Sequence, residues 1–586
     1  SQEIIQRLDG LTIGSVTYTY TINVDAATFA TGDTYTIKIY NDNGTAFVAQ
    51  ALLASATGIF TTAGSHSVTF NAVSANPIIS IEYTGIVGSG STDTWHRVND
   101  LTNNMKMVGG YNSNNNNLMG KGVAISEDGK TYLIGSPGTY QTKGDVRTYK
   151  LCTSGSNTSY PYTGSSLNKV DTIQGDSAGD ALGDREALSI SHDGSRCVIG
   201  SPFEDLGGTN IGCFKAYAWT TTNASTCAGD WEQIGTTIYG SDADDLFGHA
   251  VAMSGDGTHI AVGSKAHAGV RGTVRVYYWN TSSNAWVQKG GDVDGESTSD
   301  NFGYSVGIAD NGLTFVAGAP GDDAVGADAG HIRVYNYNGS AWVQKGADID
   351  GEANEDFFGT SCDINGAGDK VIGGAEKNDG GATSSGHAKV YSYSGSAWVQ
   401  LGADLDGPEG WAYSGAAVSL NTAGNVALVS AANTNTNELG AVASKAGSVR
   451  VYSLSGSTWS LIGLPVRGED AGDYFGFDAM LNGAGTMFIV GAPFNDGDLM
   501  GTAIAGDSGA GYVYEKQTVG NGASGSGCIT NVSVTGQVPA TSTADIDTVV
   551  NETCGLAPYT YAWTTPTATP QGALGTNSST AADLID

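Results

Sequence analysis

The sequence predicts an all-β protein whose main part is a seven-bladed β-propeller, and three observations lead to this fold class. One residue pattern repeats seven times along the chain, at intervals of roughly 55–65 residues. Glycine is abundant, with 86 of 586 residues, whereas few stretches suit a long helix. Each repeat contains four short apolar runs bounded by Gly, Asn, Asp or Ser. Four-stranded sheets repeated around an axis form a propeller.

Each repeat supplies four recognisable strands: one begins with Trp, one follows an aromatic–Gly or Leu–Gly pair, one ends in a Gly-Ala-Pro-like triplet, and one reads Val-x-Val-Tyr. The Trp strands begin at Trp231, Trp286, Trp342, Trp398 and Trp459. The pairs, two of them degenerate, are Met119-Gly120, Leu182-Gly183, Phe247-Gly248, Phe302-Gly303, Phe358-Gly359, Tyr413-Ser414 and Phe475-Gly476. Small residues after each pair suit a crowded innermost strand, and alternating Val and Tyr suit an outer strand with one wet face.

The count of strands predicts how the ring closes. The seventh repeat ends at residues 512–514 with no Trp strand after it, and an unmatched Trp strand at 95–98 precedes the first repeat. We expect 95–98 to pair with 510–516 inside a propeller domain spanning 93–519. A closed ring leaves no exposed sheet edge.

The pattern of aromatic–Gly pairs and Gly-Ala-Pro triplets resembles the FG-GAP repeats of integrin α-chain heads and related surface proteins. The resemblance covers about residues 95–517 and implies an extracellular propeller. Calcium-binding members carry an aspartate-rich loop between the two motifs. Here those loops are short, as at 126–129 and 482–485, and lack the oxygen ligands that calcium needs. The resemblance therefore does not carry calcium to that position.

Two further β modules are expected beside the propeller. Residues 1–92 alternate apolar and polar side chains and predict a β-sandwich, and 520–527 form a Gly/Ser-rich linker. Residues 528–586 are similar to an Ig-like module of the polycystic-kidney-disease type, through the segment 557–563. Such a module usually needs about 80–100 residues. Either the natural chain continues, or a neighbouring molecule adds the missing strands.

The charge of the chain excludes several partners. With 26 basic and 59 acidic residues its formal net charge is -33, which repels nucleic acids and anionic lipid. We find no apolar run near 18 residues, so we expect no direct membrane insertion. An extracellular or cell-surface location is the expectation.

Two kinds of covalent modification are expected of an extracellular chain. Candidate N-glycosylation sites are Asn43, Asn157, Asn223, Asn280, Asn338, Asn531, Asn551 and Asn577. Asn223, Asn280 and Asn338 fall at one equivalent hairpin tip in successive repeats. Among seven cysteines, the pairs Cys213/Cys227 and Cys528/Cys554 are the candidate local disulfides.

Motifs that could carry catalysis have simpler explanations. The Gly-x-Ser-x-Gly run at 303–307 lies on a predicted strand, and a nucleophile elbow needs a strand-to-helix turn. The histidines lack metalloprotease spacing, and no glycine-rich loop leads into a helix. We therefore predict a protein that is not an enzyme, with no catalytic residues and no bound organic cofactor.

Acidic loops before the aromatic–Gly pairs are the one cluster that could hold a metal. Their carboxylates are Asp292, Asp294, Glu296, Asp300, Asp348, Asp350, Glu352 and Asp356. An aspartate recurs two residues before the pair, and we favour a role in which it accepts backbone N–H groups and fixes the turn. A weak calcium site is the alternative.

The predicted function is that of a non-enzymatic structural or adhesive protein, a subunit of a surface fibre that assembles through its flanking β modules. Its expected partners are further copies of itself or other extracellular proteins, and glycans. One alternative is an integrin-like adhesin or receptor head. Another is a carbohydrate-active propeller, which would need acids and arginines converging in the central channel, a feature that the sequence does not reveal.

Overall fold

The structure of the protein is a computed structural model. Within the propeller it describes residues 117–138, 143–153, 165–205, 209–223, 227–437, 442–495 and 508–521. Elsewhere it describes strands at 2–8, 17–24, 34–40, 52–59, 64–71, 78–84, 90–97, 106–108, 531–535 and 546–551. Among these residues the only α-helix is α2, His267–Val270, and no described helix is long and apolar enough to cross a membrane.

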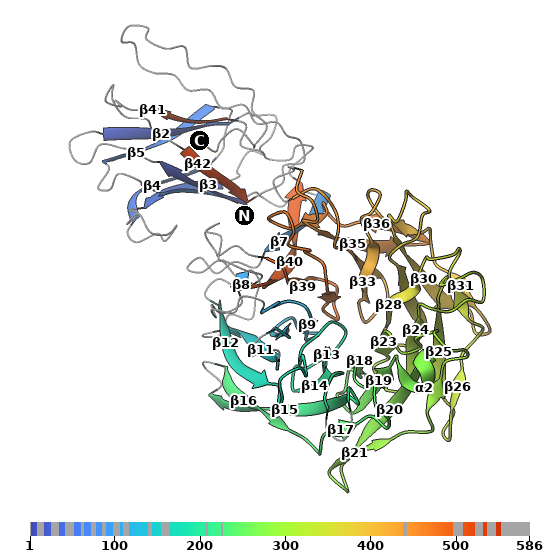
Figure 1. Ribbon diagram of the computed structural model, residues 1–586. Coiled ribbons are helices and arrows are strands. Elements are labelled where there is room, and N and C mark those ends of the chain that lie inside the picture. Colours follow the sequence, from blue (N-terminus) through green and yellow to red (C-terminus); the bar gives the residue numbers. More distant parts are fainter. Residues whose placement is uncertain are drawn as a thin grey trace. The chain divides into compact units, whose positions relative to one another are not determined.

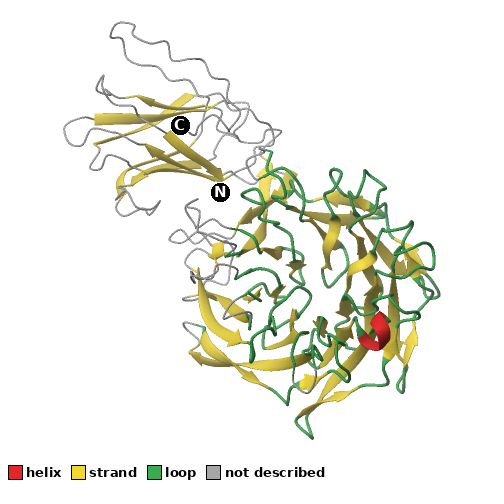
Figure 2. Cartoon of the chain, in the orientation of Figure 1, coloured by secondary structure: helices red, strands yellow, loops and turns green. Residues whose placement is uncertain are grey.

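Seven antiparallel sheets surround a central axis, which confirms the predicted all-β, seven-bladed propeller (Figure 1). In each blade the strand after the aromatic–Gly pair is innermost, followed outward by the triplet strand, the Val-x-Val-Tyr strand and a fourth strand, which contains the repeat's Trp in every blade but blade 1. The blades follow one another around the ring in chain order (Figure 1), and the described part of the ring consists almost entirely of strands and loops (Figure 2).

The first three blades follow each other from residue 123 to residue 294. Blade 1 contains β9 (Val123–Ile125), β10 (Thr131–Ser136), β11 (Asp145–Thr153) and β12 (Ser165–Gln174). Blade 2 contains β13 (Leu188–Ile190), β14 (Arg196–Ser201), β15 (Cys213–Asn223), β16 (Ala228–Gln233) and β17 (Ile238–Tyr239). Blade 3 contains β18 (Ala250–Met253), β19 (His259–Ser264), β20 (Thr273–Asn280), β21 (Ala285–Gln288) and β22 (Val293–Asp294).

The next three blades repeat this arrangement. Blade 4 contains β23 (Val306–Ile308), β24 (Thr314–Ala319), β25 (His331–Tyr337), β26 (Trp342–Gln344) and β27 (Ile349–Asp350). Blade 5 contains β28 (Phe358–Ile364), β29 (Lys370–Ala375), β30 (His387–Tyr393), β31 (Trp398–Gln400) and β32 (Leu405–Asp406). Blade 6 contains β33 (Ser414–Leu420), β34 (Val426–Ala431), β35 (Ser448–Ser455), β36 (Thr458–Leu461) and β37 (Val466–Arg467).

Blade 7 takes strands from both ends of the propeller segment. It contains β38 (Ala479–Leu481), β39 (Met487–Ala492), β40 (Ala510–Asn521), β7 (Gly90–Arg97) and β8 (Lys106–Val108). The sheet order is β38-β39-β40-β7, so a strand that precedes the first repeat in sequence lies outermost in the last blade. The ring is thereby closed through backbone pairing in one sheet.

The two motif glycines explain how neighbouring blades fit together. The glycine of each triplet lies against the carbonyl of the aromatic–Gly glycine in the next blade. At Gly318 an added Cβ would lie 2.0 Å from Gly359 O, far inside van der Waals contact. Six of the seven seams have this glycine pair, at 135/183, 200/248, 263/303, 318/359, 374/415 and 491/120. The repeat therefore needs glycine at both positions because two backbones touch there.

Tryptophan side chains link the outer parts of neighbouring blades. The Trp342 indole N–H donates to Lys289 O at 2.6 Å, and the Trp286 indole donates to Ile234 O at 3.2 Å. The same bond recurs from Trp398 to Lys345 O and from Trp459 to Leu401 O. Trp95 of β7 donates to Ile462 O at 3.1 Å, so the closing strand repeats the contact of the regular repeats.

Aromatic side chains of the pairs fill the space between blades. Phe302 is fully buried and packs with Phe315 and Tyr335 in one cluster that also contains residues of blade 3. The Phe302 and Tyr335 ring centroids are 6.1 Å apart in an edge-to-face arrangement. Each such cluster draws residues from two blades, so no blade has a complete core of its own.

The remaining strands form a second unit, made from residues 1–94 and 517–586. One sheet has the order β4-β3-β6-β1-β42 and another the order β41-β2-β5. Their strands are β1 (Gln2–Leu8), β2 (Thr17–Val24), β3 (Thr34–Tyr40), β4 (Leu52–Ile59), β5 (Gly64–Asn71), β6 (Ile78–Thr84), β41 (Asn531–Thr535) and β42 (Ile546–Asn551). Strands from both chain ends share these sheets. The sandwich at 1–92 and the partial Ig-like module at 528–586 that the sequence led us to expect stay predictions.

Candidate functional site

The central channel holds a group of ionisable side chains that sequence reasoning did not identify. The innermost strands line a cavity of about 150 Å³, and its walls include Glu186, Asp363 and Asp478. Arg185 is next to Glu186, with its Nε 4.0 Å from Glu186 Oε1. These residues replace small or apolar residues in strands that otherwise suit a crowded centre. Alignment of the seven repeats would therefore have shown them as charged exceptions.

Two of the channel acids hold neighbouring blades together. Asp363 of blade 5 accepts the N–H of Leu420 in blade 6 at 2.8 Å. Asp478 precedes β38 of blade 7 and accepts the N–H of Val123 in blade 1, also at 2.8 Å. Burial raises the pKa of each carboxyl to about 6. Innermost strands have one unpaired edge, and these carboxylates satisfy N–H groups along it.

Glu186 has the most perturbed carboxyl of the channel. Burial, followed by the negative charge of Asp478, raises the pKa of Glu186 above its ordinary value, which favours the protonated form. The Arg185 guanidinium donates to the carbonyl of Ala416. A neutral Glu186 beside a cation could donate a hydrogen bond to a polar group in the channel.

Turns that follow the innermost strands, at Glu127, His192, Gly255 and Asp310, line one part of this cavity, and we call them the collar. The N–H of Glu127 donates to His192 O, and the N–H of His192 donates to Gly255 O, both at 2.9 Å. The His192 ring lies between two carboxylates, 2.6 Å from Glu127 and 3.2 Å from Asp310. The hydrogen bond to Asp310 is the main cause that raises the pKa of His192. The His192 ring therefore connects blades 1, 2 and 4.

The recurring aspartates of the acidic loops fix turns, as the sequence analysis favoured. Asp300 accepts the N–H of Ser297 at 2.6 Å, and Asp356 accepts that of Ala353 at 2.9 Å. The same bond occurs at Asp180, Asp245 and Asp473. The carboxylate closes the loop that leads into the innermost strand.

Five of the eight predicted calcium carboxylates pair with basic side chains, which lie in the Val-x-Val-Tyr strands or, for Arg271, two residues before β20. Asp292 binds Arg275 at 3.0 Å, Asp348 binds Arg333 at 3.0 Å, and Asp294 binds Arg271 at 3.0 Å. Glu296 also pairs with Arg333, and Glu352 pairs with Lys389. Of the other three, Asp300 and Asp356 fix turns, and Asp350 lies opposite His331.

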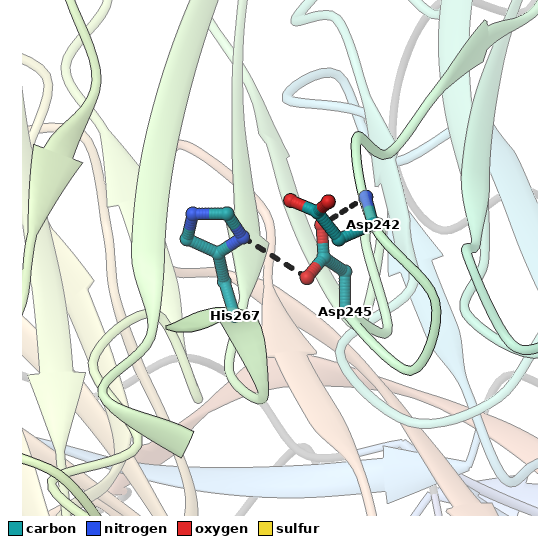
Figure 3. A group of neighbouring side chains, drawn as sticks. All are labelled: Asp242, Asp245 and His267. Atoms are coloured by element: carbon teal, nitrogen blue, oxygen red, sulfur yellow. Dashed lines mark hydrogen bonds and ion pairs between the residues drawn. The ribbon is translucent and has the colours of Figure 1, made fainter. Parts of the chain in front are cut away.

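Three groups of one histidine and two carboxylates lie on blades 3, 4 and 5. They are Asp242/Asp245/His267, Asp322/His331/Asp350 and Glu352/His387/Asp404. Figure 3 shows the blade 3 group, in which His267 Nδ1 lies 3.0 Å from Asp245 Oδ1 and the N–H of Asp242 donates to Asp245. That group is joined by its own hydrogen bonds. The sequence analysis named Asp350 and Glu352 but not the histidines, which lie at the start of β25 and β30.

The structure corrects one disulfide prediction. Cys213 at the start of β15 is a free, buried thiol, and Cys227 is disulfide-bonded, so the predicted Cys213/Cys227 pair is wrong. Burial raises the pKa of Cys213 to about 12, which makes it unreactive. Proximity in sequence failed as a guide because Cys213 begins β15, whereas Cys227 lies beside the other end of that strand, where Asn223 pairs with Ala228. Cys528 and Cys554 lie outside the described residues.

The structure describes three of the eight candidate glycosylation side chains. Asn223, Asn280 and Asn338 lie at the ends of Val-x-Val-Tyr strands, and Asn223 and Asn338 are exposed. Asn43, Asn157 and Asn577 lie outside the described residues. Asn531 and Asn551 lie in β41 and β42, and their side chains are outside the described part of the chain.

Comparison with known proteins identifies no family for this chain. No family model matches the chain, and no curated protein matches it. The WD40 repeats of RRP9 match with 11% identity and a TM-score of 0.39, covering 74% of this chain and 99% of that one. U3-55K matches with 10% identity and a TM-score of 0.38, covering 73% and 99%. A candidate 6-phosphogluconolactonase from Bacteroides uniformis matches with 9% identity and a TM-score of 0.40, covering 75% and 97%.

Proposed function

We propose that this protein is a non-enzymatic, extracellular structural or adhesive module of the FG-GAP kind, which assembles with copies of itself or with other surface proteins. The observation that carries the proposal is the use made of the channel acids. Asp363 and Asp478, where a propeller enzyme would place its reactive groups, are bound to backbone N–H groups of neighbouring blades. Because these carboxylates join blades by accepting backbone N–H groups, they favour a structural role over a catalytic one.

The seams support the same proposal. Backbone contacts between glycines, indole hydrogen bonds between outer strands and the collar around His192 each join one blade to another. Strand β7 closes the ring beside β40, so both flanking segments continue from neighbouring strands of blade 7. A module attached to its neighbours through one sheet transmits force into a ring without free sheet edges.

The surface chemistry supports an extracellular location. Asn223 and Asn338 lie exposed at equivalent strand ends, where a glycan would meet solvent. Cys227 is disulfide-bonded, and structural disulfides persist in oxidising compartments. The net charge of -33 favours solubility in a salty medium.

Sedimentation of the purified full chain tests the proposed assembly. We expect species heavier than the 59.8 kDa chain to grow with protein concentration. Val549 pairs with Ile5 between β42 and β1, and Val549→Pro should reduce assembly because proline removes a ladder hydrogen bond. Val442→Ser, at a residue 94% exposed on the propeller, is the control and should assemble normally. A chain that stays monomeric at every concentration would contradict the proposal.

An adhesin head is a second candidate, favoured by one exposed aromatic residue. Trp411 is 58% exposed, and its ring centroid is 6.5 Å from that of Tyr413 in an edge-to-face arrangement. Exposed aromatic faces suit contact with the C–H faces of sugars or with protein ligands. A glycan array probed with the full chain would show binding that Trp411→Ala abolishes. Equal signals from the two proteins, or none from either, would remove this candidate.

A further inference from the structure

A buried histidine and two aspartates meet at one end of blade 4. His331 is the first residue of β25, Asp350 lies opposite it in β27, and Asp322 follows the end of β24. His331 Nδ1 lies 3.2 Å from Asp322 Oδ1. One ligand atom from each residue lies within 4.8 Å of the other two. We call these three residues the blade 4 cluster.

The His331 ring is enclosed without a hydrogen bond. Its side chain is 1% exposed, and neither ring nitrogen meets hydrogen-bond geometry with any described group, in spite of the short distance to Asp322. Asp322 is also buried, and its Oδ1 accepts the N–H of Ala324 at 3.0 Å. Buried polar groups without partners are rare because their desolvation is uncompensated. Nδ1 thus has only the ion-pair contact with Asp322, and Nε2 lacks the partner that its burial requires.

Comparison between blades shows that blade 4 has a carboxylate where blades 3, 5 and 7 have a histidine or an asparagine. The position of Asp322 is occupied by His267, Asn378 and Asn495 in blades 3, 5 and 7. Each of these lies 2.8–3.0 Å from the turn aspartate of its own blade. In blade 4, burial and then the charge of Asp322 raise the pKa of the turn aspartate Asp300. Two carboxylates therefore stand where blades 3, 5 and 7 have a hydrogen-bonded pair; blade 2 also has two, Glu204 and Asp180, but no histidine beside them among the described residues.

Nearby basic side chains do not neutralise this charge as they do in blade 5. In the Glu352/His387/Asp404 group, Lys389 pairs with Glu352 and lies 3.6 Å from Asp404. The corresponding Arg333 of blade 4 pairs with Glu296 and Asp348, which lie outside the blade 4 cluster. Of the three groups, the blade 4 cluster is therefore the one that combines a buried imidazole nitrogen without a hydrogen bond and carboxylates that pair with no lysine or arginine among the described residues.

We propose that the blade 4 cluster binds one divalent transition-metal ion, with Zn²⁺ as the best match, through His331, Asp322 and Asp350. One imidazole nitrogen with carboxylate oxygens is a ligand set that zinc takes in proteins. Calcium is the poorer match, because it takes six to eight oxygen ligands. The ion would bind the His331 imidazole, neutralise the two carboxylates, and link β25 and β27 with the loop after β24.

Titration of the full, chelator-treated chain with Co²⁺ tests the proposal, since Co²⁺ reports its ligands by visible absorption. We expect a band that saturates with one ion from this site and that Zn²⁺ displaces. His331→Gln and Asp350→Asn should each lose the band, and Asp350 is exposed, so its substitution leaves folding intact. His267→Gln is the matched control, because its histidine is already hydrogen-bonded, and should keep the band.

Several results would overturn the proposal. They are no Co²⁺ band in the wild-type chain, an unchanged band in Asp350→Asn, or a band lost in His387→Gln but retained in His331→Gln. Thermal unfolding gives an independent readout. Zn²⁺ should raise the Tm of the wild-type chain and of His267→Gln, and leave that of Asp350→Asn unchanged. Equal shifts in wild-type and Asp350→Asn proteins would also count against the site.

Discussion

Substituting Gly318 with Ala tests the physical basis of the seams between blades. The new Cβ would lie 2.0 Å from Gly359 O and 2.5 Å from Ser305 Oγ, whereas real Cβ contacts are essentially never under 3.0 Å. Blades 4 and 5 must therefore separate by about 1 Å at this point, against backbone that cannot rotate away. Overpacking of this kind costs about 1–3 kcal/mol, and contact with rigid backbone places Gly318→Ala near the upper value.

Urea unfolding of the full chain measures this cost. The midpoint should fall while the slope stays the same, because the surface exposed on unfolding does not change. Gly291→Ala is the control: an added Cβ there has nothing within 4 Å, and its φ is not in the left-handed region. Its free energy of unfolding should change by less than about 0.5 kcal/mol. If Gly318→Ala unfolds at the same urea concentration as Gly291→Ala, our explanation of the paired glycines is wrong.

Three further predictions follow from the contacts described. Trp342→Phe should lower the free energy of unfolding by about 1–2 kcal/mol, because it leaves Lys289 O without its indole donor. Trp411→Phe, at an exposed site, is the control and should change that free energy little in the same denaturant melts. His192→Gln should lower the free energy of unfolding more at pH 5.5 than at pH 8.5, because the pKa of His192 is raised in the folded chain. The stabilisation that His192 gives is complete below the usual histidine pKa of about 6.5 and is lost as pH rises through the folded pKa. Equal losses of stability at both pH values would contradict this. Cys197, Cys213 and Cys362 should resist alkylation at pH 8 until the chain is unfolded, and peptide mapping should find no Cys213–Cys227 bridge.

The repeat made the propeller predictable from the sequence. Seven landmarks in phase, each with strand-forming residues and a turn, leave little choice of architecture, and the unmatched Trp95 pointed to the place where β7 lies. What the sequence could not reveal was why Gly318 and Gly359 are both glycine. The contact joins residues of different blades, and their closeness arises only when the ring is complete.

The candidate sites were less predictable for the same reason. The carboxylates at Asp292 and Asp348 were visible as an acidic pattern, but their partners Arg275 and Arg333 lie in the preceding strand of the sheet. His331 attracts no attention in sequence, because its importance comes from burial beside Asp322. Pattern reasoning finds residues of one type at regular spacing. It does not find a site made from single exceptions in different strands.

Electron microscopy of the native material, with no partner added, is the most direct test of the proposed structural role. Our account predicts regular filaments in which one seven-bladed ring recurs per repeat, connected through the unit formed by residues 1–94 and 517–586. Dispersed single particles, each with one ring and no contact between copies, would contradict it.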